Sequence, residues 1–130
     1  MDNGNHKKRL LVIDDEENMR HMLSTVLAKA GYRVECATDG SQGLEMIDDS
    51  LYDFILCDIK MPKMDGMAFL KAARSQLETS TIIMMSAYGT IDTAIEAMKL
   101  GAYDYISKPF KTDEVYLTLK KAEERESLEI

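Results

Sequence analysis

The chain has 130 residues, of which 45% are hydrophobic and 30% charged, and this balance fits one globular domain with a single core. Its net charge of −7 argues against direct binding to nucleic acid, because phosphate repels an acidic surface. No apolar run approaches the roughly 20 residues of a membrane-spanning helix, and the polar start of the chain lacks the pattern of a signal peptide. We therefore expect a cytoplasmic protein that does not bind membranes.

Hydrophobic runs predict five strands, at residues 9–13, 33–37, 54–57, 81–85 and 103–106. A segment with apolar residues at helical spacing follows each of them. The first helix is expected to end before Gly31, because glycine suits the position after a helix. Its buried residues are predicted to be Met19, Met22, Leu23, Val26 and Ala30.

The second helix is predicted to begin at a capping box formed by Asp39 and Gln42, and the third to run from residue 66 to residue 77. Thr90 is expected to cap the fourth helix, which ends at Gly101. The apolar stripe of the fourth helix is predicted to contain Ile91, Ala94, Ile95 and Met98. The inward residues of the fifth are predicted to be Val115, Leu119 and Ala122.

Strands that alternate with helices indicate a parallel sheet covered by helices on both faces, which is the doubly wound α/β fold. We expect one (βα)5 domain over residues 8–122, preceded by a flexible arm at residues 1–7. Residues 123–130 fit either the end of the last helix or the start of a linker.

Polar residues follow four of the predicted strands at the point where each strand ends. Asp14 and Asp15 follow the first strand, Asp58 the third, Ser86 the fourth and Lys108 the fifth. Because the carboxyl ends of parallel strands share one edge of a sheet, these side chains are expected to meet there.

Three clustered carboxylates repel one another, by on the order of 4 kcal/mol for two charges about 4 Å apart at an effective dielectric constant of about 20. A divalent cation removes this repulsion, and a small set of oxygen ligands suits Mg²⁺. Asp58 is then a candidate nucleophile that forms an aspartyl-phosphate. Lys108 would supply a second positive charge, and Ser86 a hydrogen bond to the phosphoryl group.

These residues and their neighbours resemble the receiver domains of response regulators in two-component systems. The motifs that carry the resemblance are Asp14 with Asp15, Asp58 with Met61, Pro62, Asp65 and Gly66, Ser86 with Ala87, and Lys108 with Pro109 and Phe110. The resemblance implies a flavodoxin-like strand order of 2-1-3-4-5 and phosphorylation of Asp58 by a histidine kinase. It also implies Mg²⁺ on Asp15, Asp58 and the backbone carbonyl of Lys60, with Asp14 assisting, and a contact between Lys108 and the phosphoryl group.

The stretch from residue 86 to residue 110 looks most like the receivers of enhancer-binding, sigma-54-dependent transcriptional activators, in which an ATPase domain and a DNA-binding domain follow. Neither output domain is recognisable in this sequence. An excised domain fits the sequence, and so does a free-standing receiver that acts as a phosphotransfer intermediate or an interaction switch. In either case we expect no enzyme activity beyond weak self-catalysed phosphorylation and dephosphorylation.

Phosphorylation is expected to turn Ser86 toward the phosphoryl group and to admit Tyr105 into the space that Ser86 leaves. The change would alter a face made by the fourth helix, the fifth strand and the fifth helix, through which a homodimer could form. The residues predicted on this face are Ile91, Ala94, Lys99, Tyr103, Lys111 and Tyr116. A cis peptide bond between Lys108 and Pro109 is also predicted, since X–Pro bonds tolerate the cis form.

Three other interpretations use the same fold. An aspartate-based phosphatase usually has a DxDxT-type nucleophile loop, whereas Ile59, Lys60 and Met61 follow Asp58 here. A flavodoxin-like cofactor binder needs a phosphate-cradling loop after the first strand, where this chain has the acidic residues 14–17. A receiver-shaped interaction module that is never phosphorylated would not need the complete set of site residues.

Overall fold

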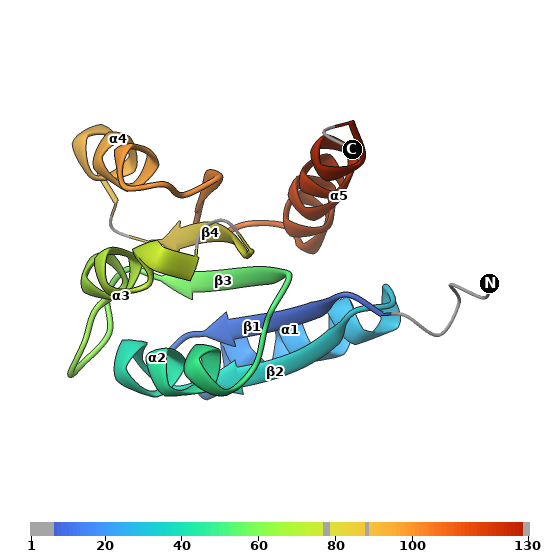
Figure 1. Cartoon of the computed structure of the whole chain (residues 1–130), viewed down its shortest axis with the longest axis horizontal. Helices are drawn as coiled ribbons and strands as arrows, with labels where there is room; N and C mark the ends of the chain where they lie inside the picture. Colours follow the sequence, from blue (N-terminus) through green and yellow to red (C-terminus); the bar gives the residue numbers. More distant parts are fainter. Residues whose placement is uncertain (1–6, 77–78, 88, 129–130) are drawn as a thin grey trace.

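The computed structural model describes residues 7–76, 79–87 and 89–128, and this part of the chain forms a five-stranded sheet with helices on both sides (Figure 1). All strand pairs are parallel and their order is β2-β1-β3-β4-β5, as predicted. The strands are β1 (Arg9–Ile13), β2 (Arg33–Ala37), β3 (Phe54–Asp58), β4 (Thr81–Ser86) and β5 (Asp104–Ser107). The helices are α1 (Glu17–Lys29), α2 (Gly40–Asp49), α3 (Gly66–Ala72), α4 (Ile91–Lys99) and α5 (Thr112–Leu128), with a 3₁₀ turn, η2, at Arg74–Gln76.

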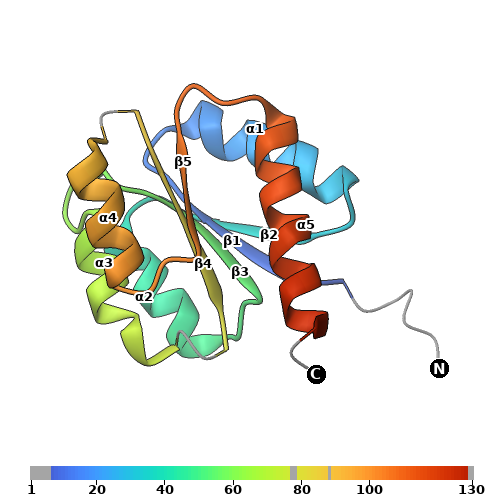
Figure 2. The same cartoon turned by 90° about the horizontal axis from the view of Figure 1, so that it is seen from above.

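The helices divide between the two faces of the sheet (Figure 2): α1 and α5 cover one face, and α2, α3 and α4 cover the other. Each face therefore has its own half of the core, and alternate residues of the central strands enter each half. Leu10 and Val12 pack on the α1 and α5 side, whereas Leu11 and Ile13 pack on the opposite side. The central strands are buried on both faces, which explains why they read as unbroken apolar runs.

Three strands end one residue later than predicted, because their last polar residues still take part in the parallel ladder. Asp58 pairs with Met85, so β3 includes the carboxylate, and Ser86 pairs with Ser107, so β4 and β5 extend to these serines. The third helix is shorter than predicted: α3 ends at Ala72 and the chain continues as η2. The expected end of that helix at residue 77 lies outside the described residues.

The apolar stripe predicted for the fourth helix does not form the buried side of that helix. Ile91 is 79% exposed, and Ile95 and Met98 are also exposed, whereas Ala97 is the buried residue of α4. Helix α4 has apolar residues on two of its faces, and the face that packs against the sheet is the one with the small residue Ala97. A smaller correction concerns α1, which buries Leu23 and Leu27 and leaves Ala30 exposed at its end.

The prediction for the fifth helix is confirmed, since Val115, Leu119 and Ala122 are buried. Residues 123–128 belong to this helix, and α5 continues without a break to Leu128. Within the described ranges, no helix combines the length and the apolar character needed to cross a bilayer.

Candidate phosphorylation site

Strand pairing brings three carboxylates together at the carboxyl edge of the sheet. Ile13 lies opposite Cys57 in the β1–β3 ladder, so Asp14 and Asp58 follow side by side. Asp15 extends the cluster, and one oxygen from each of the three carboxylates lies within 4.8 Å of the others. The predicted convergence of these side chains is thus present in the structure.

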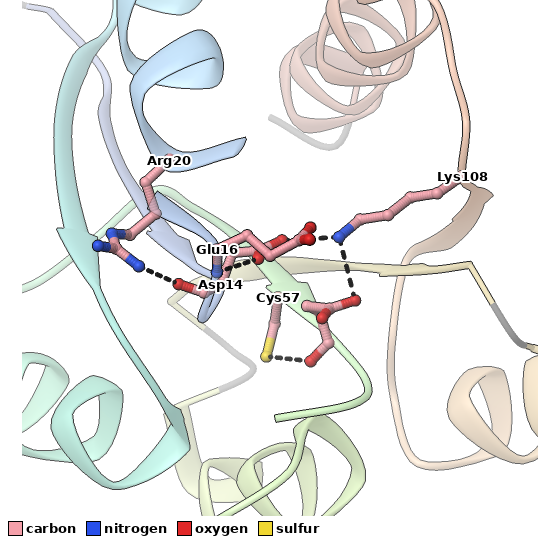
Figure 3. A network of polar contacts seen from close by, with 6 residues as sticks. Asp14, Glu16, Arg20, Cys57 and Lys108 are labelled. Atoms are coloured by element: carbon pink, nitrogen blue, oxygen red, sulfur yellow. Dashed lines mark hydrogen bonds and ion pairs between the residues drawn. The ribbon is translucent and has the colours of Figure 1, made fainter. Parts of the chain in front are cut away.

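Asp14 is the most firmly held of the three, because all its polar atoms have partners. Figure 3 shows its contacts with Glu16, Arg20 and Lys108. The carboxylate accepts a hydrogen bond from the Glu16 amide at 2.9 Å and another from Lys108 Nζ at 2.8 Å. Its backbone amide donates to the Ala37 carbonyl, and its backbone carbonyl accepts a hydrogen bond from Arg20. Asp14 is 0% exposed, so this set of bonds compensates for the burial of its charge.

Lys108 links two of the three carboxylates. Its ammonium nitrogen lies 2.8 Å from Asp14 Oδ2 and 3.3 Å from Asp58 Oδ1. The bond between Lys108 and Pro109 is cis, which confirms the prediction. Burial would lower the pKa of the Lys108 ammonium, but the contacts with Asp14 and Asp58 outweigh burial and raise it. Lys108 is therefore a fixed positive charge at neutral pH.

Asp58 is only 6% exposed, and burial raises the pKa of its carboxyl to about 6. The Lys108 charge lowers this pKa, while the negative charge of Asp14 raises it further. One lysine therefore does not offset both the burial of Asp58 and its repulsion from Asp14. A second positive charge next to Asp58 would relieve the remaining repulsion.

The cluster opens into a cavity of about 210 Å³. Its walls are formed by Asp15, Glu16, Asp58, Lys60, Ala87 and Lys108. Carboxylate and carbonyl oxygens are the ligands that Mg²⁺ prefers, and Mg²⁺ retains several waters when it binds to few protein ligands. A partly open, all-oxygen cluster whose charge is incompletely neutralised fits that ion. The residues present thus suit a Mg²⁺ site.

Neither Ser86 nor Tyr105 lines this cavity. Ser86 is buried at the end of β4, and its neighbour Ala87 forms part of the cavity wall. The Tyr105 hydroxyl is buried without a hydrogen-bond partner among the described residues. It packs directly against Gly89, where a Cβ atom would come within 1.3 Å of the hydroxyl oxygen. The Tyr105 hydroxyl is thus already buried in this structure. Its coupling to Ser86 stays a prediction.

Sequence reasoning missed two residues that shape the site. Glu16 lines the cavity and binds the Asp14 carboxylate through its backbone amide, and Arg20 binds the Asp14 backbone carbonyl. Neither bond can be recognised in the sequence, because each involves a backbone group. The Glu16 backbone amide donates the first bond, and the Asp14 backbone carbonyl accepts the second. Gly66 was recognised only as part of a motif. A Cβ atom there would lie 2.2 Å from the Asp58 carbonyl oxygen, so glycine permits the loop after β3 to pack against the site.

A parallel sheet that gathers three carboxylates and a partly buried lysine at its carboxyl edge is the architecture of signalling receiver domains. The chain belongs to the response regulator receiver domain family, whose model matches residues 10–120. Receiver domains are signalling phosphoacceptors and not a family of catalytic enzymes. The family identified from the sequence is confirmed.

Individual relatives agree with this assignment. The chain is 42% identical to the regulatory protein AtoC of Escherichia coli K12 over 92% of its length and 41% identical to the transcriptional regulatory protein ZraR of Klebsiella oxytoca over 87%. It spans 26% of the length of each of these relatives. A CheY-like receiver domain from Methanospirillum hungatei JF-1 superimposes with a TM-score of 0.90 at 27% identity, covering 95% of this chain and 99% of that one.

Proposed function

We propose that this domain is a phosphorylation-controlled switch that accepts a phosphoryl group on Asp58 from the phosphohistidine of a histidine kinase. The observation that carries the proposal is the arrangement of Asp58, Asp14 and Lys108: a buried carboxylate lies beside a second one, and a single ammonium group contacts both. A carboxylate of this kind is a nucleophile that retains its negative charge while the site provides positive charge for an incoming phosphoryl group.

Mg²⁺ would be held by Asp15, Asp58 and the backbone carbonyl of Lys60, and when bound it neutralises charge on the phosphoryl oxygens. Asp14 is expected to assist from the second layer, because both its carboxylate oxygens already accept hydrogen bonds. Asp15, which is exposed at the cavity, is free of that constraint and is the better direct ligand.

In the transfer step, a carboxylate oxygen of Asp58 attacks the phosphorus atom of the phosphohistidine. The P–O bond forms as the P–N bond breaks, and the electron pair returns to the imidazole nitrogen of the kinase. The imidazole takes one proton from water, so the histidine leaves as a neutral ring. Lys108 remains paired with Asp14 and offers its remaining N–H groups to a phosphoryl oxygen. The Ser86 hydroxyl donates a further hydrogen bond once it turns toward the group.

The signal is proposed to leave through the face of α4, β5 and α5. Exposed apolar side chains on α4, Ile91, Ile95 and Met98, give it the character of a binding surface. A second copy of the domain is the proposed partner in the phosphorylated state. Because the relatives AtoC and ZraR are named as regulatory proteins, control of transcription by an attached output domain is the proposed result.

The proposed domain extends over residues 8–122, with residues 1–7 as an arm and residues 123–130 as the helix end or the connection to an output domain. A cytoplasmic location is proposed, since the phosphoryl donor is a cytoplasmic kinase domain. Self-catalysed phosphorylation and dephosphorylation are expected to be slow compared with transfer from the kinase.

Intact-mass measurement after incubation with acetyl phosphate and Mg²⁺ tests the proposal. Wild-type protein is expected to gain the mass of one phosphoryl group, and Asp58→Asn is expected to gain none. Asp48→Asn, which removes an exposed carboxylate from α2, is the matched control and should behave like the wild type. Equal phosphorylation of wild type and Asp58→Asn would disprove the assignment of Asp58.

A further inference from the structure

We propose that Arg20 is a positioning residue for the Mg²⁺ site, although it contacts neither the cavity nor a carboxylate. This inference rests on the proposed function, because it concerns how the metal ligands are held. Arg20 lies in the first turns of α1, where its own amide donates to the Glu16 carbonyl. Its guanidinium reaches back to the loop after β1 and donates to the Asp14 backbone carbonyl at 2.9 Å.

The contacts of Asp14 divide between its side chain and its backbone (Figure 3). Lys108 and the Glu16 amide bind the carboxylate, whereas Arg20 lies on the opposite side and binds the carbonyl. The loss of Arg20 would remove neither donor to the carboxylate. It would remove the side-chain contact that fixes the peptide group after Asp14.

That peptide group controls Asp15. The carbonyl of Asp14 and the amide nitrogen of Asp15 belong to one planar unit, so a hydrogen bond to the carbonyl also fixes the direction in which Asp15 leaves the strand. Asp15 is the exposed member of the cluster and lines the cavity. Its carboxylate therefore depends on the backbone for its position toward Asp58, and a charged donor is a strong means of holding that backbone.

The charge of Arg20 and its position act on Mg²⁺ binding in opposite directions. As a nearby cation, Arg20 repels Mg²⁺, so removal of its charge alone would strengthen binding. As a holder of the Asp14–Asp15 peptide, it organises the ligands, and loss of such outer contacts typically weakens metal binding about 10- to 100-fold. The sign of the change in affinity therefore separates the two roles.

Calorimetric titration of the full chain with Mg²⁺ tests the inference in the wild type, Arg20→Gln and Arg20→Lys. We expect Arg20→Gln to bind about tenfold more weakly or worse, and Arg20→Lys to recover part of the loss because it retains one charged donor. Arg74→Gln removes an exposed arginine from η2 and should bind like the wild type. Binding by Arg20→Gln that is equal to or tighter than wild type would overturn the proposal.

A second measurement, made without metal, keeps the inference separate from the proposed function. Hydrogen exchange of the Glu16 amide reports whether the loop that holds Asp14 is intact. Exchange should be faster in Arg20→Gln than in Arg74→Gln at equal global stability, and unchanged exchange would refute the positioning role. A wild type that neither binds Mg²⁺ nor gains a phosphoryl group would instead refute the proposed function, whatever the exchange shows.

Discussion

Replacing Asp58 with asparagine should stabilise the metal-free protein at neutral pH, even though it removes the proposed phosphoacceptor. Burial raises the pKa of the Asp58 carboxyl from 3.8 to about 6, so the folded state binds this proton more tightly than the unfolded chain does. A difference of about 2 in pKa corresponds to about 3 kcal/mol. The ionised carboxylate thus destabilises the fold by up to this amount at pH values above about 6.

The pH dependence gives the sign of the effect. Between the pKa of the unfolded chain, about 4, and the folded value, about 6, the free energy of unfolding of the wild type should fall as the pH rises. Asp58→Asn has no proton to lose there, so its advantage should be largest above pH 6 and should vanish at about pH 4.

Urea unfolding in EDTA over a series of pH values measures this advantage. Glu45→Gln removes an exposed carboxylate from the middle of α2 and serves as the control for the change in net charge. A stability gain at pH 7.5 that shrinks on acidification, and that the control lacks, is the expected result. A loss of stability at pH 7.5, or a gain that does not depend on pH, would refute the idea that the buried, ionised Asp58 carboxylate destabilises the fold.

Three further substitutions test other parts of the structure. Lys108→Met should raise the pKa of Asp58 still further, because the charge of Lys108 lowers that pKa. An NMR titration of the Asp58 carboxyl carbon measures the change, and an unchanged midpoint would contradict the ion pair between Lys108 and Asp58. Tyr52→Phe should raise the pKa of Glu35, because the hydrogen bond from the Tyr52 hydroxyl is the main cause of that low pKa. On acidification, the stability that the ionised Glu35 contributes should then be lost at a higher pH. An NMR titration of the Glu35 carboxyl carbon measures the shift in pKa. Gly89→Ala should displace the Tyr105 ring, since a Cβ atom would lie 1.3 Å from its hydroxyl oxygen, and unaltered ring resonances of Tyr105 would exclude this packing.

The strands were predictable because burial on both faces leaves a simple sequence pattern. Unbroken apolar runs such as residues 10–13 and 54–57 can be recognised without knowledge of their neighbours. The position of Asp14, Asp15 and Asp58 at one edge then follows from parallel pairing alone. The exact ends were less predictable, since Asp58 and Ser86 join the ladder only because neighbouring strands extend as far.

Helix α4 shows where periodicity is insufficient. Its sequence offers two apolar sides, one with Ile91, Ile95 and Met98 and another with alanine at positions 94 and 97. Hydrophobicity favours the larger side chains as the core, but the structure buries Ala97 and leaves the larger residues at the surface. The close approach of a short helix to the sheet decides between them, and a single sequence does not encode that distance in its pattern.

The contacts that support the site could not be predicted from the sequence, for a different reason. Residue types identify carboxylates and lysines, but the bonds from Arg20 and from the Glu16 amide involve backbone groups that every residue has. The position of Tyr105 against Gly89 likewise depends on the path of a loop and not on a motif. Such contacts emerge only when the backbone is placed in three dimensions.

Mapping the phosphoryl group after exposure to acetyl phosphate tests the central claim most directly. Rapid digestion and peptide mass analysis, with and without Mg²⁺ at matched ionic strength, would locate the modification and measure its yield. We predict one phosphoryl group per chain, on the peptide that contains Asp58, and formation that depends on Mg²⁺. Modification of another residue, or equal yield when EDTA replaces Mg²⁺, would contradict the account.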